Sequence, residues 1–183
     1  MKQGWQNDVL SFWFDELTAE DWFSGKSDVD DKIRARFGDL YEELKRGLDP
    51  DTVKDQNTAL AAVIALDQFP RNLFRGQPAA FATDNLAIEI ARHAVETQLD
   101  HGLPNERKQF LYMPFMHSEI SADQERCVDL FLSLDNENGL KYAVEHRDII
   151  LQFGRFPHRN KALGRQTTDA ERQFMEGHAG YGQ

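Results

Sequence analysis

The sequence is short of cysteine, of long apolar runs and of the signals that direct a chain to a membrane. Its single cysteine, Cys127, excludes an intramolecular disulfide and suits a reducing compartment. No stretch approaches the roughly 20 apolar residues of a membrane-spanning helix. Residues 1–8 lack an apolar run behind a basic start, so no signal peptide is predicted. We therefore expect a cytoplasmic protein with no membrane partner.

Basic residues are also in deficit. Lys and Arg number 21 against 31 Asp and Glu, which gives a formal net charge of −10. This balance argues against nucleic acid as a partner, because phosphate backbones attract positive surfaces. The apolar share is 40%, with 13 Phe, and such a composition excludes a disordered chain. We expect one domain, residues 1–183, with a loose C-terminal tail at 177–183.

The alternation typical of β-strands is nearly absent, and apolar residues recur at helical spacing along most of the chain. Residues 28–46 carry one apolar face, from Ile33 to Leu44, and a charged opposite face. Residues 59–66 are apolar on every side, which predicts a central helix covered all round. Short connections favour antiparallel neighbours. The prediction is an all-α domain of about seven or eight helices without a sheet.

Capping residues and turns predict where the helices begin. Ser121 with Gln124 and Thr168 with Glu171 have the spacing of a capping box. The other predicted starts are Asn7 or Asp8, Thr18, Asp84, Asn105, and Leu140 after an Asn138–Gly139 turn.

Two distant stretches carry an aromatic–proline pair followed by Arg and Asn. They are LDQFPRNLFRG at 66–76 and FGRFPHRN at 153–160. Proline cannot continue a helix and disfavours helical geometry in the residue before it, so each pair is predicted to stop a helix. Pro114 is predicted to kink or break a third helix, just before His117 and Glu119. Polar side chains therefore follow apolar helices in three places.

The segment 149–168 reverses the charge of the chain. It contains no acid, whereas Arg155, Arg159, Lys161 and Arg165 are basic. The same segment lacks a helical pattern after Gly154, and long loops inside compact domains tend to be functional or held in place by burial.

These three motifs resemble the signatures of the bacterial family called domain of unknown function 924. They are LDQFPRN at 66–72, PFMHSE at 114–119, and FGRFPHRN followed by LGR at 153–165. The resemblance covers nearly the whole chain and implies a tetratricopeptide-like fold, a stack of antiparallel helix pairs. It implies no activity, substrate or catalytic residue.

If the three motifs meet in space, their polar side chains form one cluster. Arginine forks bind phosphate and carboxylate well, and histidine can act as general acid or base near neutral pH. The candidate ligand-binding residues are Asp67, Gln68, Arg71, Asn72, Arg155, Arg159, Asn160 and Arg165. The candidate catalytic residues are His117, Glu119, His146 and His158. This pattern favours a site for a small anionic ligand, with enzymatic activity left open between none and a hydrolase or transferase.

Two other interpretations use the same residues. A closed ion-pair network would also gather arginines, acids and histidines without any ligand. A helical scaffold that binds a peptide or protein partner in a concave groove is the third possibility. A metal site of His117, Glu119, His146 and His158 is disfavoured, because the His-x-Glu spacing at 117–119 lacks the His at i+4 of a helical ligand pair and the arginines repel cations. No cofactor is predicted.

Overall fold

The computed structural model describes residues 2–23 and 25–178, and this part of the chain is helical with no strand. It contains α1 (Trp5–Ser11), α2 (Ala19–Phe23), α3 (Ser27–Gly47), α4 (Gln56–Val63), α5 (Phe69–Leu73), α6 (Asp84–Glu96), α7 (Asn105–His117), α8 (Ser121–Leu132), α9 (Glu137–Phe153) and α10 (Asp169–Glu176). The all-α prediction is confirmed. No helix in the two described ranges is both long and apolar enough to cross a bilayer.

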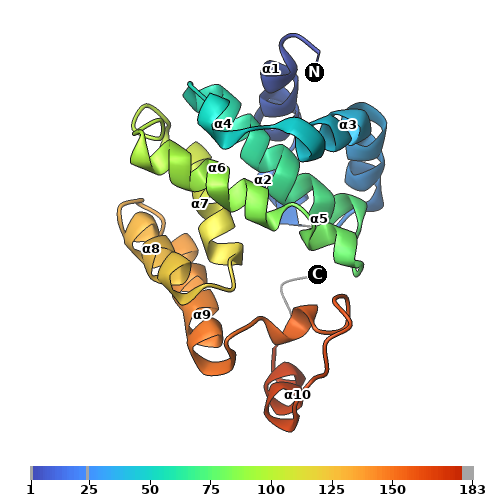
Figure 1. Ribbon diagram of the computed structural model, residues 1–183, viewed down its shortest axis with the longest axis vertical. Coiled ribbons are helices and arrows are strands. Elements are labelled where there is room, and N and C mark those ends of the chain that lie inside the picture. Colours follow the sequence, from blue (N-terminus) through green and yellow to red (C-terminus); the bar gives the residue numbers. More distant parts are fainter. Residues whose placement is uncertain (1, 24, 179–183) are drawn as a thin grey trace.

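The central helix predicted at 59–66 lies in the middle of the core. It is formed by α4 and a π turn, Ile64–Gln68, which runs directly into α5. Asp55 caps its start by accepting from the backbone N–H groups of Asn57 and Thr58. Every side chain from Ala59 to Leu66 is fully buried. The prediction of a helix covered on every side is confirmed, since α4 contacts α1, α6 and α7 (Figure 1).

The predicted helix stop at Phe69–Pro70 is wrong. Phe69 keeps helical geometry, with φ −58° and ψ −43°, and its N–H donates to the carbonyl of Ile64, five residues earlier. This wider turn accommodates the proline ring, which would otherwise clash with the preceding turn. The carbonyl of Leu66 has no N–H partner at Pro70, and the Thr83 hydroxyl donates to it at 2.6 Å instead. The chain therefore stays helical to Leu73.

Several other helix boundaries in the structure differ from the predicted ones. Pro114 lies inside α7, which continues to His117 without a break. The first helix begins after Gly4, whose φ is +81°, and not at Asn7 or Asp8. The residue before α8 is Ile120, so Ser121 makes no capping box.

At the start of α9, the Asn136 side chain accepts from the N–H of Gly139. Residues 138–139 therefore belong to the first turn of the helix and do not form a separate turn before it. The predicted capping box of Thr168 and Glu171 is present.

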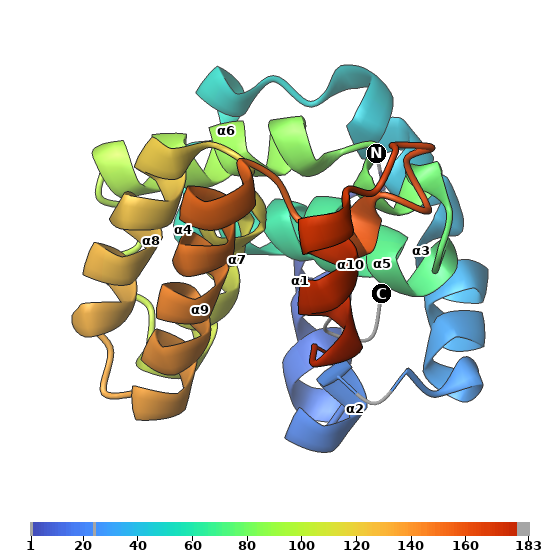
Figure 2. The ribbon, with the colours of Figure 1, turned by 90° about the horizontal axis from the view of Figure 1, so that it is seen from below.

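The second half of the chain packs as successive neighbours. The helix α6 contacts α7, α7 contacts α8, and α8 contacts α9. A small second core of Ile149, Ile150 and Phe156 joins α9 to the loop that follows it. In the view of Figure 2, α9 lies on one side of α10 and α3 lies on the other. The likeness to a tetratricopeptide superhelix stays a prediction.

The predicted C-terminal tail is only partly within the described residues. The N–H of Gly177 donates to the carbonyl of Phe174 at 3.2 Å, and His178 is the last residue that the structure describes. Residues 179–183 lie outside the described part of the chain.

Thr83→Val tests whether the buried hydroxyl sustains the helix across Pro70. We expect the free energy of unfolding to fall by about 1–3 kcal/mol, because the change removes a hydrogen bond to the buried carbonyl of Leu66. Urea denaturation followed by circular dichroism measures this loss. Thr97→Val is the matched control, since its hydroxyl makes an equally short bond of 2.6 Å to the carbonyl of His93 but is exposed. Equal losses in the two variants would contradict the interpretation.

Candidate functional site

A buried carboxylate and an imidazole form the centre of the candidate site. Asp67 lies in the π turn with none of its side chain exposed, and His117 is the last residue of α7. The Nδ1 atom of His117 lies 2.8 Å and 3.0 Å from the two carboxylate oxygens. A carboxylate only accepts, so Nδ1 carries a proton and Nε2 is left with the lone pair of the neutral ring.

Both groups have shifted pKa values. Burial lowers the pKa of His117, and the nearby Arg71 guanidinium lowers it further, so the ring is neutral at pH 7. Burial acts against ionisation of Asp67, but Arg71 and the hydrogen bond from His117 outweigh it and lower the pKa of the carboxyl. The pair is therefore a carboxylate and a neutral imidazole.

Arg71 connects this pair to the start of α6. Its Nη1 lies 3.1 Å from the Asp67 carboxylate and donates to the backbone carbonyl of Asp67 at 2.7 Å. The same guanidinium makes a two-point contact with Asp84, at 2.9 Å and 3.1 Å. Asp84 also lies 3.4 Å from Nη1 of Arg159, in the loop after α9. One chain of charges thus links three distant segments.

Two cavities adjoin this network, and His117 lines both of them. The first cavity, about 540 Å³, lies between α2, α5, α7 and α9. Its apolar lining is Trp22, Phe23, Met113, Met116, Phe131 and Tyr142, and its amides are Gln68, Asn72, Gln109, Asn136 and Asn138. Within the described residues, Arg71 and Arg75 provide its charged lining, and no acid contributes to it.

The second cavity, about 500 Å³, lies between α6, the segment from α7 to α8, and the loop after α9. Its charged lining residues are Asp84, Glu89, Arg92, Glu119 and Arg159. Apolar side chains, among them Phe81, Ile88 and Pro114, complete the walls.

The structure brings most, but not all, of the predicted site residues to these cavities. Gln68, Arg71, Asn72, His117 and His146 line the first cavity. The second has His117, Glu119 and Arg159 in its lining. Asp67 is fully buried beside His117. Arg155, His158, Asn160 and Arg165 line neither of the two cavities, and their role in ligand binding stays a prediction.

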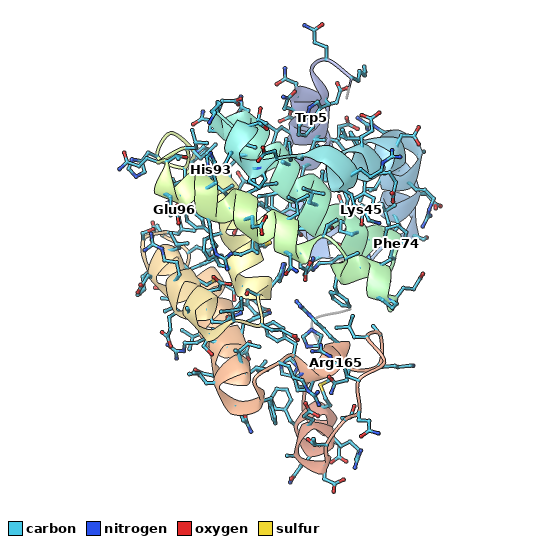
Figure 3. All side chains as sticks on the ribbon, viewed as in Figure 1. Trp5, Lys45, Phe74, His93, Glu96 and Arg165 are labelled. Atoms are coloured by element: carbon cyan, nitrogen blue, oxygen red, sulfur yellow. The ribbon has the colours of Figure 1, made fainter. Side chains whose placement is uncertain are left out.

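Two of these outlying arginines hold the C-terminal loop in place. Arg155 contacts Glu171 of α10 at 2.7 Å and 3.0 Å and lowers the pKa of that carboxyl to about 2. Arg165, labelled in Figure 3 on the loop between α9 and α10, binds Glu119 at 2.8 Å and 3.0 Å. Glu119 also accepts from the N–H of Phe156 at 2.8 Å. This part of the cluster matches the interpretation as an ion-pair network.

His146 and His158 pack against Phe156, at ring distances of 5.5 Å and 5.4 Å. Burial lowers the pKa of each to about 3, so both rings are neutral at pH 7. The Nδ1 atom of His146 bonds to the carbonyl of Tyr142 at 2.8 Å. In the part of the chain that the structure describes, no group of three or more His, Cys, Asp or Glu side chains could hold a metal ion.

The family model described as "Bacterial protein of unknown function (DUF924)" matches residues 9–179. The chain belongs to this family. The structure of a protein of unknown function from Agrobacterium tumefaciens is similar to it, with 37% sequence identity and a TM-score of 0.86. That match covers 94% of this chain and 97% of the other. Among curated proteins no significant match was found.

Sequence reasoning missed two residues of this DUF924 site. Arg75 lines the first cavity and binds Asp30 at 2.9 Å and 3.0 Å. Its spacing of four residues from Arg71 within the 66–76 motif could have indicated it. The sequence indicates Asp84 only as a helix start, and acids at helix starts are too common to single it out. Its role depends on Arg71 and Arg159, which reach it across the fold.

Asp67→Asn should lower the free energy of unfolding by about 3–5 kcal/mol at pH 7, because it removes a charge from the buried pair with Arg71. Urea denaturation measures the loss, and Asp31→Asn, at an exposed ion pair, is the control. The folded state lowers the pKa of Asp67, so its contribution is present above the ordinary aspartate pKa of about 3.9 and is lost as pH falls further. A variant as stable as the control would contradict this account.

His146→Gln should reduce the pH dependence of stability. An unfolded histidine takes up a proton near pH 6.5, whereas His146 in the folded protein does so near pH 3. Below pH 6.5 the unfolded state binds more protons, so stability falls as pH falls, by up to about 1.4 kcal/mol per pH unit for this one group. We expect the free energy of unfolding, measured by urea denaturation at pH 5 and pH 6, to change less between the two pH values in the variant than in the wild type. An identical change with pH in the variant and the wild type would contradict a low pKa of His146.

Proposed function

We propose that the first cavity binds a small organic molecule carrying a carboxylate or phosphate group. The observation that carries this proposal is the charge of the lining. Arg71 and Arg75 face a cavity to which the described chain contributes no acid, in a protein of net charge −10. Guanidinium donors that face a cavity without lining acids favour an anionic ligand.

The acids that pair with these arginines support the proposal, because they do not line the cavity. Asp84 holds Arg71, and Asp30 holds both Arg75 and the Asn72 amide, at 2.8 Å for the latter. Such contacts fix the guanidinium groups before a ligand arrives and so reduce the entropy lost on binding.

The rest of the lining suits the body of an organic molecule. Aromatic and methionine side chains offer apolar contact, and five amides offer donors and acceptors. The volume of about 540 Å³ is in the range of small-molecule sites, about 300–1,000 Å³. A peptide-binding scaffold would spread its arginines and aromatic groups along several helices, whereas here they surround one cavity.

His117 supports a reaction at this site. Its ring is neutral, its tautomer is fixed by Asp67, and Nε2 is the nitrogen left for a bound molecule. A carboxylate that orients an imidazole in this way is a common arrangement for a general base. The reaction class that fits is hydrolysis or group transfer on the bound anion, with His117 as the base.

The binding proposal is tested with a panel of small carboxylates and phosphate monoesters, each paired with the uncharged amide or alcohol of the same skeleton. We expect some of the anions, and none of their neutral counterparts, to raise the melting temperature. Arg75→Gln should weaken the binding of these anions at least about tenfold, because a charge-assisted contact is lost. Isothermal titration calorimetry measures the affinity.

The matched control is Arg36→Gln. Arg36 also makes a two-point pair with an acid, Glu16, but lines neither of the two cavities. It should leave the affinity unchanged. If no anion binds, or if both variants lose affinity equally, the proposal is wrong.

A further inference from the structure

We propose that the second cavity is a separate binding site for a carboxylate or phosphate group, and that Arg159 is the residue that binds it. Arg159 lines the second cavity and not the first. The inference therefore stands apart from the function proposed above.

The guanidinium of Arg159 packs against two aromatic rings. Its central carbon lies 4.7 Å from the ring centre of Phe81 and 4.6 Å from that of Phe156. Only 5% of the residue is exposed. Such packing fixes the plane of the group and shields it from water.

This buried cation has few hydrogen-bond acceptors. Its one ion pair in the described chain is the 3.4 Å contact to Asp84, which is long for a charge-assisted bond. Its Nε is buried and has no hydrogen-bond partner among the described residues. The Nε of Arg165 is also buried without a partner, but that guanidinium makes two close bonds to Glu119, at 2.8 Å and 3.0 Å. A buried donor without an acceptor is costly, so Arg159 is a group that a ligand could satisfy.

Asp84 cannot move to Arg159 without cost, because both of its oxygens already bind Arg71, at 2.9 Å and 3.1 Å. Two of the other three charged lining residues are also engaged. Glu119 is bound by Arg165, and Arg92 binds Asp123 at 2.7 Å. The buried end of the cavity is thus left with one cation that lacks a close anion.

The shape and lining of the cavity limit the ligand. Its volume is about 500 Å³, and Phe81, Ile88 and Pro114 offer apolar contact. Glu89, an exposed residue of α6, also contributes a carboxylate to the lining. We therefore expect a small organic acid or phosphate ester whose charged group lies against Arg159.

The shared imidazole gives this site a further consequence. His117 lines both cavities, so a molecule bound at Arg159 would lie beside the same ring as the ligand of the first cavity. Such a pair of sites suits a transfer reaction between two molecules better than hydrolysis. This consequence alone rests on the proposed function; the Arg159 site does not.

The experiment follows the Nε–H signal of Arg159 by NMR in the full ¹⁵N-labelled protein. The signal is assigned as the one missing from the spectrum of Arg159→Lys. Sodium acetate, methyl phosphate and inorganic phosphate are titrated separately, with sodium chloride at matched ionic strength as the reference. We expect a saturable shift of this signal, and of the backbone amides of residues 84–89, with at least one of the three anions and none with chloride.

Two variants with small changes in the cavity, and one control outside it, sharpen the test. Asn85→Asp adds a negative charge to the lining and should weaken the binding roughly fivefold, as one charge several Å away would at an intermediate dielectric constant. Glu89→Gln removes a negative charge and should strengthen binding by a similar factor. Asn105→Asp makes the same change at the start of α7, outside both cavities, and should have no effect.

Three results would overturn the proposal: no saturable shift with any of the anions, a shift equal to that caused by chloride, or equal effects of Asn85→Asp and Asn105→Asp.

Arg75→Gln separates the two sites. It should weaken the ligands of the first cavity and leave the Arg159 titration unchanged. If it abolishes both, there is only one site and the inference is wrong. If no anion binds to the first cavity but the Nε–H signal of Arg159 shifts saturably with an anion, only the proposed function is wrong.

Discussion

The structure depends on one buried charge, the carboxylate of Asp67. With none of its side chain exposed, this group needs compensation from the protein, and it receives an ion pair from Arg71 and hydrogen bonds from His117 and Gln68. These contacts fix the end of α7 against the turn that leads into α5. The walls of both cavities meet at this junction, because His117 belongs to each of them.

The π turn before Pro70 is what makes this arrangement possible. If the helix had stopped at Phe69, Arg71 would not lie one turn after Asp67 with its guanidinium on the carbonyl and carboxylate of that residue. The hydrogen bond from Phe69 to Ile64, five residues earlier, widens the turn so that the proline ring does not clash with it. The Thr83 hydroxyl donates to the carbonyl of Leu66. A local rule about proline is thus overridden by two compensating contacts, one of them from a residue 17 positions away.

The basic segment after α9 has two parts with different roles. Arg155 and Arg165 find their acids on other elements, Glu171 on α10 and Glu119 after α7, and they hold the loop to the body. Arg159 differs from both, because its nearest carboxylate is shared with Arg71. The contacts of Arg155 and Arg165 therefore match the ion-pair network, one of the three interpretations that the sequence left open, and a ligand site at Arg159 stays a proposal.

The sequence by itself determined the helical class, the covered helix at 59–66, the family resemblance and three motifs, each of which contributes residues to a cavity that His117 also lines. These features are local, since periodicity, composition and short motifs are properties of neighbouring residues. Only the tertiary structure decided the course of the chain through Pro70 and Pro114, the pairing of each arginine, and the role of Asp84. Those outcomes depend on contacts between segments tens of residues apart, such as Asp67 with His117 and Asp84 with Arg159, and distances of that kind are set by packing.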